Sequence, residues 1–375
     1  MSNTRLLDPD RGFDTPFALD TLEELRSIMT DDAELAARIE KLYAGAQLVD
    51  LKRGEHYPEL LRAKLGLRTA VASAMHVDPA SVLPNFGSNG SIDTVMSAAS
   101  ILAPERAVRT RPAVLVATPT YFRNYDSATS RGLEVVEVPL GRDSTFDADA
   151  YISAMQQCRP RLAVLVTPNN PTGIAISDDD LLRVVDAACD GTWVMIDRTL
   201  VNTRPEVSTR SLLERYRHKD LVILHSFSKY RSMSQHRIGV ALFSNPQFAA
   251  AVEPMLPLGL SLEACVKATS ILLAEGRLAP SAAVLENIRA SRRVLDEFVA
   301  THPDYEITDF SSNYCLLTLP PRFSAKALTD ELARSGIQVM GGHEFPQPNY
   351  RVLRIHTGGE ASKMERLCGA LAAAG

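Results

Sequence analysis

The stretch LVILHSFSKYRSMSQHRIGVALF, residues 221–243, places a single lysine between two apolar runs. Its first four and last six residues have the composition of buried strands, so the pattern predicts strand, loop, strand. Lys229 follows the first strand, directly after Ser228 and close to Ser226. Apolar surroundings disfavour the charged form of an amine, which makes a lysine at the end of a buried strand more nucleophilic than a surface lysine. Such an amine can form a Schiff base.

The same segment suits a phosphate monoester, because Ser226 and Ser228 supply two hydroxyls and Arg237 supplies a fixed cation. An ordinary lysine in a solvated loop is the alternative for this segment taken alone, since S-x-S-K is a short pattern. The wider pattern is S-x-S-K ending at Lys229, an arginine eight residues later, and then Ile-Gly. It resembles the pyridoxal-phosphate lysine motif of the class I and II aminotransferases, nearest to the histidinol-phosphate aminotransferase branch.

This resemblance implies a fold, a cofactor and a partner. The fold is α/β, fold type I of the enzymes that depend on pyridoxal 5′-phosphate, with a mostly parallel seven-stranded sheet and a smaller α/β domain. The implied divisions are an N-terminal arm and helix that joins the small domain (1–44), a large cofactor-binding domain (45–275) and a small C-terminal domain (276–375). Because the family's sites use residues from two subunits, the resemblance also implies a homodimer with shared active sites.

Composition and charge exclude several other classes of protein. A chain of 375 residues, 45% hydrophobic and 23% charged, is long enough for a large core and indicates two domains. The net charge of −5 and the scattered basic residues argue against a nucleic-acid-binding surface. We find no signal-peptide pattern and no run of about 18 apolar residues, so we expect a cytoplasmic protein that does not enter a membrane. Five widely spaced cysteines indicate reduced thiols, without a disulfide framework or a metal site.

A second candidate for phosphate binding lies at residues 82–91, VLPNFGSNGS, which we expect to form a turn that leads into a helix from Ile92. Gly90 would let the main chain approach a phosphate, and the amides of Ser91 and Ile92 would lie at the positive end of the helix. A plain turn is the alternative, because a loop rich in glycine and serine is weak evidence alone. The sequence S-N-G-S at 88–91 resembles the family's G-N-G-S-D phosphate turn, although Ile92 stands where an acidic residue is common.

Two further motifs follow predicted buried strands. Tyr121 comes after the strand at 113–117, and its ring can stack on a pyridine ring. It matches the aromatic residue of the family's P-T-Y segment. Asn170 lies in the turn PNNPTG after the strand at 162–167, and the resemblance assigns it a hydrogen bond to the cofactor's ring oxygen. The alternatives are a tyrosine at the rim of a pocket and a purely structural turn.

Asp197 ends the strand predicted at 192–196, where a carboxylate can keep a pyridine nitrogen protonated and make the ring an electron sink. The family usually continues Asp-Glu-Ala-Tyr, and the tyrosine donates to the same ring oxygen as the asparagine. This chain has Asp-Arg-Thr-Leu at 197–200. Leu200 cannot donate a hydrogen bond, so the pattern leaves the type of reaction open. Arg198 is either substrate-facing or on the surface.

Arg354 lies in the strand-like run at 351–356 and matches the arginine of the family's L-R-I strand, which binds the substrate α-carboxylate through a bidentate pair. A structural ion pair is the alternative, because a buried arginine needs a partner. We expect Asn170 to help orient the substrate. Tyr57 precedes a Pro-Glu pair that opens a predicted helix, and in the family this tyrosine reaches the partner subunit's cofactor phosphate. Residues 7–12, LDPDRG, replace the family's asparagine-rich segment.

Together the motifs imply an aminotransferase of amino acid metabolism that acts on an amino acid or related amine through Lys229, with Asp197 and Tyr121 as further catalytic residues. A second hypothesis keeps the cofactor but changes the reaction to decarboxylation, β-elimination or oxidative deamination in a specialised biosynthetic pathway, and Leu200 favours it. A third, a non-catalytic binding protein, has no need for the lysine. The substrate side chain is open, because four polar residues could face it: Arg123, Asn124, Arg198 and Arg231.

Overall fold

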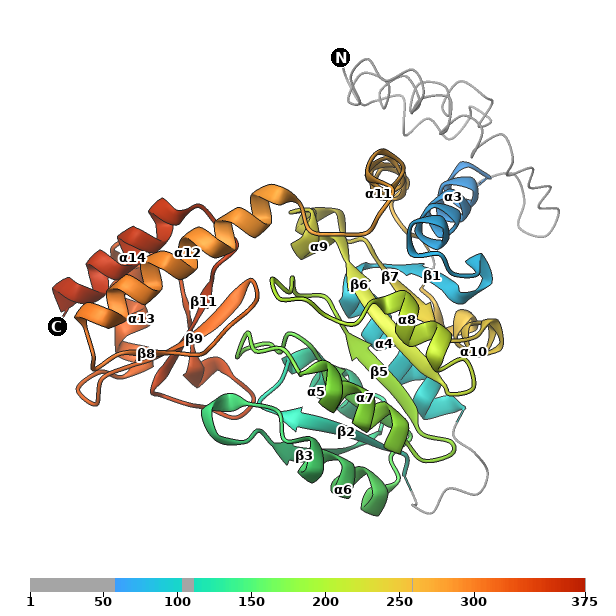
Figure 1. Ribbon diagram of the computed structural model, residues 1–375, viewed down its shortest axis with the longest axis horizontal. Coiled ribbons are helices and arrows are strands. Elements are labelled where there is room, and N and C mark those ends of the chain that lie inside the picture. Colours follow the sequence, from blue (N-terminus) through green and yellow to red (C-terminus); the bar gives the residue numbers. More distant parts are fainter. Residues whose placement is uncertain (1–57, 103–110, 258, 375) are drawn as a thin grey trace, which may run out of the picture.

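The described part of the chain contains two β-sheets. The computed structural model describes residues 58–102, 111–257 and 259–374. Figure 1 shows a larger body built on one sheet and a smaller body, coloured orange to red, built on the other. The larger sheet has seven strands and the smaller sheet has four. The mixed α/β architecture, with its mostly parallel larger sheet, confirms the predicted fold class.

The strands of the larger sheet are β1 (Val82–Asn85), β2 (Ala113–Thr118), β3 (Glu134–Pro139), β4 (Leu162–Val166), β5 (Trp193–Asp197), β6 (Leu221–Ser226) and β7 (Gly239–Phe243). They lie side by side in the order β1-β7-β6-β5-β4-β2-β3. Neighbours from β3 across to β6 are parallel, whereas β7 is antiparallel to both β6 and β1. The inner strand β4, LAVLV, is apolar along its whole length because helices cover both faces of the sheet.

Alternate side chains of each strand enter two separate cores. On β6, for example, Ile223 packs into one core and Leu224 into the other. The first core is covered by α3 (Pro58–Met75), α6 (Ala148–Cys158), α7 (Asp178–Ala187), α8 (Thr209–Arg215) and α11 (Leu262–Glu275), and the second by α4 (Gly87–Ile101), α5 (Phe122–Thr129) and α10 (Pro246–Val252). Figure 1 shows α3 and α11 side by side. Both faces of the sheet are therefore closed to a ligand.

The carboxyl ends of the parallel strands meet at one edge of this sheet. The strands β2, β4, β5 and β6 end at Thr118, Val166, Asp197 and Ser226. In Figure 1 the arrow of β2 points toward the smaller body. Ligands of open α/β sheets bind outside the carboxyl ends of the strands, so the fold places the predicted motifs between the two bodies.

The smaller sheet is antiparallel and runs in the order β10-β11-β9-β8. The elements of this body are α12 (Ala282–Thr301), β8 (Glu306–Ile307), β9 (Tyr314–Thr318), α13 (Ala325–Arg334), β10 (Met340–Gly341), β11 (Val352–His356) and α14 (Ala361–Ala374). Leu295, Leu317, Leu353 and Leu371 belong to its buried core. In Figure 1, α12 runs from the larger body alongside α14. The division predicted at 45–275 and 276–375 stays a prediction, and the arm predicted at 1–44 lies outside the described residues.

The segment just before β9 is hydrogen-bonded to two turns of the larger body. Val201 N donates to Asn313 Oδ1 at 2.7 Å, and Ser311 N donates to Gly173 O at 3.0 Å. Gly173 has φ +74°, and a Cβ there would lie 1.8 Å from Tyr314 O, so only glycine fits this approach. The turns that follow β4 and β5 are thereby fixed against β9.

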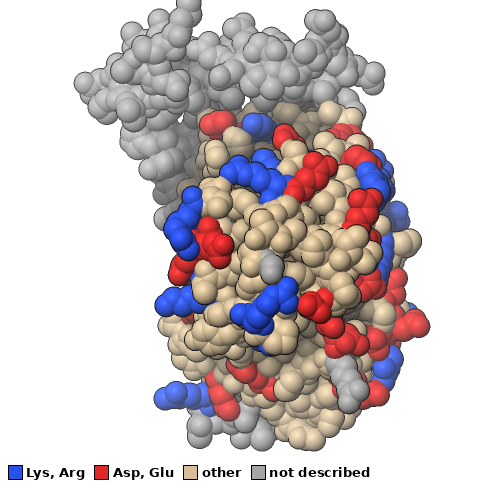
Figure 2. Space-filling view, turned by 90° about the vertical axis from the view of Figure 1, so that its left-hand side faces the viewer, with Lys and Arg blue, Asp and Glu red and all other residues tan. Residues whose placement is uncertain are grey.

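The surface charge is mixed on the face shown in Figure 2. Basic and acidic side chains are interspersed there, and the described residues form no broad basic surface on that face. Within the described ranges, no helix combines the length and the apolar composition that crossing a membrane requires.

Candidate active site

Lys229 lies at the carboxyl edge of the larger sheet, in a single turn of helix. The strand β6 ends at Ser226, α9 (Phe227–Tyr230) carries the lysine, and a short 3₁₀ helix, η4 (Ser234–His236), leads back to β7. The two predicted strands are confirmed, and the segment expected to be a loop contains these helical turns. The Ser226 hydroxyl caps α9 by accepting a hydrogen bond from Ser228 N at 3.2 Å. This cap holds the main chain of the lysine turn at the sheet edge.

A cavity of about 250 Å³ opens beside the lysine. The predicted site residues that border it are Tyr121, Asn170, Asp197, Ser228, Lys229, Arg237 and Arg354. They come from segments far apart in the sequence and from both bodies of the protein. The fold therefore brings together side chains that the separate motifs predicted one by one.

Asp197 is 3% exposed at the last position of β5. Thr199 donates two hydrogen bonds to its Oδ1, one from the main-chain amide at 2.9 Å and one from the hydroxyl. Oδ2 has no hydrogen-bond partner among the described residues. Burial raises the pKa of Asp197, and the hydrogen bonds from Thr199 oppose that shift. A buried carboxylate with one free oxygen needs a donor from the cavity it borders.

The helix predicted from Ile92 begins earlier. Its first residue is Gly87, and residues 82–85, predicted as part of a turn, form β1 instead. Ser91 and Ile92 lie inside the helix and are fully buried. The prediction that their amides form the positive end of the helix is therefore wrong in its register.

The free amides at the start of α4 are instead those of Gly87, Ser88 and Asn89, which precede Ser91 in the sequence. The next amide, of Gly90, already donates to the Phe86 carbonyl at 3.4 Å, and the first turn of a helix leaves such amides unpaired. Ser88 and Asn89 border the cavity. An anion at this end of the cavity would meet the positive end of a 15-residue helix.

Two glycines allow close approaches near this end of the cavity. A Cβ at Gly87, where φ is +65°, would lie 3.2 Å from Arg237 NH2 and 3.8 Å from Ser226 Oγ. A Cβ at Gly239 would lie 2.8 Å from Gly87 Cα. The start of α4, the start of β7 and the Arg237 guanidinium thus converge on one small volume, and the Ser228 side chain borders the same cavity.

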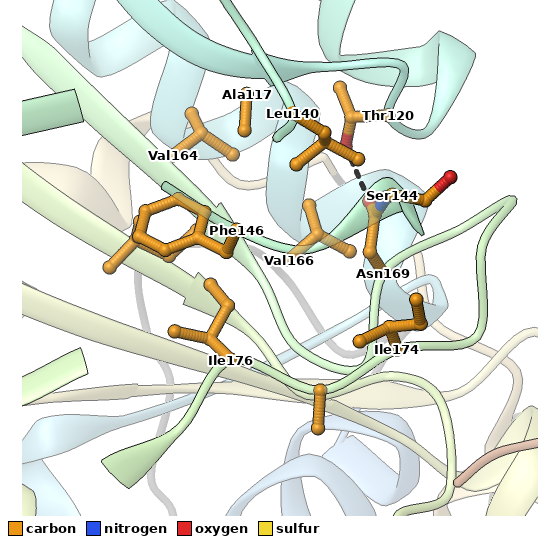
Figure 3. A pocket seen from close by; sticks show the side chains of 12 residues that line it. Ala117, Thr120, Leu140, Ser144, Phe146, Val164, Val166, Asn169, Ile174 and Ile176 are labelled. Carbon is orange, nitrogen blue, oxygen red and sulfur yellow. Dashed lines mark hydrogen bonds between the residues drawn. The ribbon is translucent and has the colours of Figure 1, made fainter. Parts of the chain in front are cut away.

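The turn after β4 uses its two asparagines differently. Asn169 ties the turn to the segment after β2: the Thr120 hydroxyl donates to Asn169 Oδ1 at 3.1 Å, drawn as a dashed line in Figure 3, and Asn169 Nδ2 donates to Pro119 O at 3.0 Å. Asn170 instead borders the cavity, where Arg354 NH1 donates to its Oδ1 at 2.9 Å. The Asn170 amide nitrogen is left as a donor for a ligand.

Tyr121 precedes α5 and borders the cavity. Its hydroxyl donates to Asn89 Oδ1 at 3.0 Å. Burial raises the pKa of this phenol, so the hydroxyl stays protonated as a donor. Leu200 borders the same cavity, is 5% exposed and offers no hydrogen-bond donor from its side chain.

Two residues of the smaller body border the cavity although the sequence had assigned them no role. The Tyr314 ring centroid lies 4.6 Å from Arg354 Cζ and 5.3 Å from Lys229 Nζ. Met340 is the cross-strand partner of Arg354 in the β10–β11 pair. The Asn-Tyr pair at the start of a predicted strand is a signal for Tyr314, whereas Met340 has no signal of its own.

Besides Ser91 and Ile92, two of the predicted site residues that the structure describes do not border this cavity. Ser226 is 1% exposed and acts as the cap of α9. Gly90 borders a neighbouring cavity of about 450 Å³, which shares Asn89 and Arg237 with the first one. Tyr57 lies outside the described residues.

The polar residues left open for the substrate side chain do not border the cavity. Arg123 pairs with Asp93, and Arg231 pairs with Glu275. Asn124 is fully buried. Each of these side chains is therefore held away from a ligand in the cavity.

Arg198 is also buried, at 2% exposed. Its NH1 donates to Thr209 Oγ1 at 3.2 Å and lies 3.9 Å from a carboxylate oxygen of Glu206. The same threonine hydroxyl lies 2.9 Å from His225 Nε2. Both alternatives for Arg198, substrate-facing and surface, are therefore wrong.

The geometry defines a class of protein. A lysine after β6, a buried aspartate at the end of β5 and a helix with free amides after β1 surround one cavity at the edge of a mostly parallel sheet. This is the arrangement of the fold type I enzymes that depend on pyridoxal 5′-phosphate, as the sequence motifs predicted.

Comparison with known proteins shows the family. The model of the family "Aminotransferase class I and II" matches residues 58–371, and the chain belongs to this family. The histidinol-phosphate aminotransferase of Chlorobaculum parvum is 30% identical over 304 residues, which cover 77% of this chain and 76% of that protein. The protein is therefore an aminotransferase with pyridoxal 5′-phosphate as its cofactor. The comparisons do not favour decarboxylation, β-elimination or oxidative deamination as its reaction.

Solved structures share the fold. The histidinol-phosphate aminotransferase of Clostridium acetobutylicum has a TM-score of 0.70 at 19% identity, covering 82% of this chain and 88% of that one. The enzyme of the same name from Sinorhizobium meliloti, in complex with pyridoxal-5′-phosphate, has a TM-score of 0.69 at 20% identity, covering 92% and 88%. At these identities the likeness shows the fold alone.

Proposed function

We propose that this aminotransferase takes its amino group from an amino acid or related amine, and that Lys229 carries out the proton transfer. The observation that carries the proposal is the convergence of Lys229, Asp197, Asn170 and Arg354 around one cavity. When bound, pyridoxal phosphate supplies an aldehyde that condenses with amines and a protonated ring that accepts the electron pair left on an α-carbon.

The free oxygen of Asp197 is the feature that best fits the cofactor. A buried carboxylate with one unpartnered oxygen is suited to accept a hydrogen bond from a protonated pyridine nitrogen. Tyr121 would stack on the ring, and the Asn170 amide would donate to the ring oxygen. The residues that would hold the phosphate are Ser88, Asn89, Ser228 and Arg237.

The remaining groups of the cavity act on the amino donor. Arg354 would bind the α-carboxylate through its guanidinium fork, and Asn170 keeps that guanidinium in place by accepting its hydrogen bond. The Lys229 amine would take the proton from the α-carbon of the donor. It would then deliver that proton to the aldehyde carbon of the cofactor, which keeps the amino nitrogen. Its position on the capped turn α9 keeps this amine within the cavity.

Single-turnover spectroscopy of the purified holoenzyme tests the proposal. Mixed with a panel of amino acids, the enzyme should release one oxo acid per site, identified by mass spectrometry, and leave the cofactor in its amine form. Release of carbon dioxide or of a β-substituent would instead identify one of the alternative reactions. Lys229→Ala should abolish the turnover, whereas Lys326→Ala, at an exposed position of α13, should not.

We also propose that two copies of the chain complete the site. The neighbouring cavity beside Asn89 and Arg237 opens at the phosphate end, and Tyr57 of a second copy would reach the phosphate there. Light scattering should give twice the chain mass, and Tyr57→Phe should weaken cofactor binding without changing the mass. A monomer with full activity would contradict this.

A cytoplasmic location is the last part of the proposal. The five cysteines form no disulfide bond in the structure, which is typical of a reducing compartment. Fractionation of cells that produce the protein, with the activity assayed in each fraction, tests this location.

A further inference from the structure

Five of the residues that line the cavity are Phe122, Leu200, Tyr314, Met340 and Arg354. We infer that they face the amino donor, because the set contains Arg354, which would bind the α-carboxylate. We call this set the donor wall. Three of them, Tyr314, Met340 and Arg354, come from the smaller body. The Tyr314 ring centroid lies 4.6 Å from Arg354 Cζ, and Met340 is the cross-strand partner of Arg354. Cross-strand partners of this kind have their side chains on the same face of a sheet.

The donor wall has a single cation among the described residues. The positively charged residues that border the cavity are Lys229, Arg237 and Arg354. The proposed function assigns Lys229 to the proton transfer, Arg237 to the cofactor phosphate and Arg354 to the α-carboxylate. No described cation on this wall is then left for a second anionic group of the donor.

The nearest other arginines have partners of their own. Arg123 is engaged by Asp93, and Arg231, whose side chain is 6% exposed, is engaged by both carboxylate oxygens of Glu275. Turning Arg231 toward the donor would leave Glu275 without a cation among the described residues. Turning Arg123 away would leave Asp93 with Arg131 alone, whose NH1 lies 3.6 Å from Asp93 Oδ1. Such a rearrangement is unfavourable for partly buried charges.

We propose that the amino donor of this enzyme carries a neutral, apolar side chain, aliphatic or aromatic, beside its α-carboxylate. The inference rests on the proposed function and specifies its substrate. An apolar side chain against Phe122, Leu200 and Met340 gains free energy by leaving water. A phosphate or carboxylate in the same place would lose its hydration without gaining a partner. The preference therefore differs from what the name of the Chlorobaculum parvum relative states for that protein.

The test compares donors in single turnovers of the holoenzyme. We expect leucine, methionine and phenylalanine to react with kcat/KM at least about tenfold higher than histidinol phosphate, aspartate and glutamate, because pocket contacts of this kind discriminate by about 10- to 200-fold. A phosphorylated or acidic donor that reacts best would overturn this inference and leave the proposed function standing. Failure of every amine to react would overturn both.

Binding of unreactive carboxylic acids gives a second readout that needs no turnover. In calorimetric titrations of the holoenzyme, 4-methylvalerate should bind at least about tenfold more tightly than 3-phosphonopropionate, on the same physical ground. Equal or reversed affinities would overturn the inference.

Variants of the donor wall locate the preference. Met340→Lys places a second cation beside Arg354 and should shift the ratio of glutamate to leucine turnover by at least about tenfold toward glutamate. Met340→Leu, which conserves volume, should leave the ratio unchanged. Phe122→Lys is a second test of the donor wall. Misfolding is not expected in this variant, because the Phe122 side chain is 42% exposed. An unchanged ratio in both lysine variants would show that these side chains do not face the donor and would overturn the inference.

Discussion

Thr199 donates two hydrogen bonds to one oxygen of Asp197, from its main-chain amide and from its hydroxyl. Burial raises the pKa of the aspartate and these hydrogen bonds lower it, so Thr199 favours the charged carboxylate. The other oxygen has no hydrogen-bond partner among the described residues, so it is available to the ring nitrogen that the proposed function assigns to it. The usual family pattern has alanine at the position of Thr199, so the hydroxyl is a feature of this chain.

Replacement of Thr199 by alanine removes the hydroxyl and keeps the amide bond. We expect the dissociation constant of pyridoxal phosphate to rise by about 10- to 150-fold, because a hydrogen bond to a charged group contributes about 1.5–3 kcal/mol. The pH at which the cofactor is released on acidification should also move upward, since the pKa of Asp197 rises without the hydroxyl. Quenching of Trp193 fluorescence during titration of the apoenzyme measures the affinity.

Thr199→Ser is the matched control for this experiment. Serine keeps the hydroxyl and should bind the cofactor within about threefold of wild type, a difference below 1 kcal/mol. If the alanine and serine variants bind and titrate alike, the hydroxyl has no part in holding the carboxylate.

Arg354 should act on the donor and not on the cofactor. Arg354→Gln removes the charge that would bind the α-carboxylate, and we expect kcat/KM for the donor to fall by about 10- to 150-fold, the value of a hydrogen bond to a charged group. The affinity for pyridoxal phosphate should stay near that of wild type. The control is Arg351→Gln on the same chain segment, because the Arg351 guanidinium bonds to the Leu319 carbonyl and not to the cavity. Equal losses in the two variants would contradict the assignment.

The sequence predicted those parts of the site that follow continuous apolar runs. Strands buried on both faces read as unbroken apolar segments, and for this reason the positions of β5 and β6 before Asp197 and Lys229 could be found without the structure. The ends of parallel strands meet at one edge of a sheet, so two motifs at such ends could also be expected to converge.

The start of α4 could not be found in this way. Residues 87–90, Gly-Ser-Asn-Gly, have low helix propensity and the composition of a turn, yet they form the first turn of the helix. Proline disfavours a strand in general, but β1, which contains Pro84, is at the edge of the sheet, where proline is tolerated. The burial of Arg198 depends on Thr209 and His225, which come from other elements, and no local pattern contains that information.

Gly239 should be needed for cofactor binding. A Cβ there would lie 2.7 Å from His225 O and 2.8 Å from Gly87 Cα, and main-chain atoms cannot move aside as a flexible side chain can. We expect Gly239→Ala to displace the start of α4, to weaken pyridoxal phosphate binding at least about tenfold and to lower the free energy of unfolding by about 1–3 kcal/mol. Gly369→Ala in α14, where a Cβ meets nothing within 4 Å, should leave the cofactor affinity unchanged and should not lower the free energy of unfolding, because alanine is the better helix former. Unaltered cofactor affinity in the first variant would show that this contact does not shape the phosphate end.

His225 should make the protein less stable in mild acid. Burial, helped by the nearby Arg198 charge, lowers the pKa of this histidine from 6.5 to about 3. Above pH 6.5 the histidine is neutral in both the folded and the unfolded chain and has no effect. As the pH falls below 6.5 the unfolded chain binds a proton that the folded chain refuses, so the free energy of unfolding decreases by about 1.4 kcal/mol per pH unit until the pH nears 3.

His225→Gln removes the group that binds this proton. Between pH 6.5 and 4 the free energy of unfolding should therefore fall less steeply than in wild type, by about 1.4 kcal/mol per pH unit. Denaturant unfolding at a series of pH values measures it. The pKa of His356 is lowered to about 4 by burial and by the charges of Lys229 and Arg354, so part of the wild-type slope should persist in the variant. His218→Gln, at an exposed position, should leave the slope as it is in wild type. A His225→Gln profile parallel to that of wild type would mean that the buried imidazole binds its proton in the folded state, which its burial and the nearby Arg198 charge disfavour.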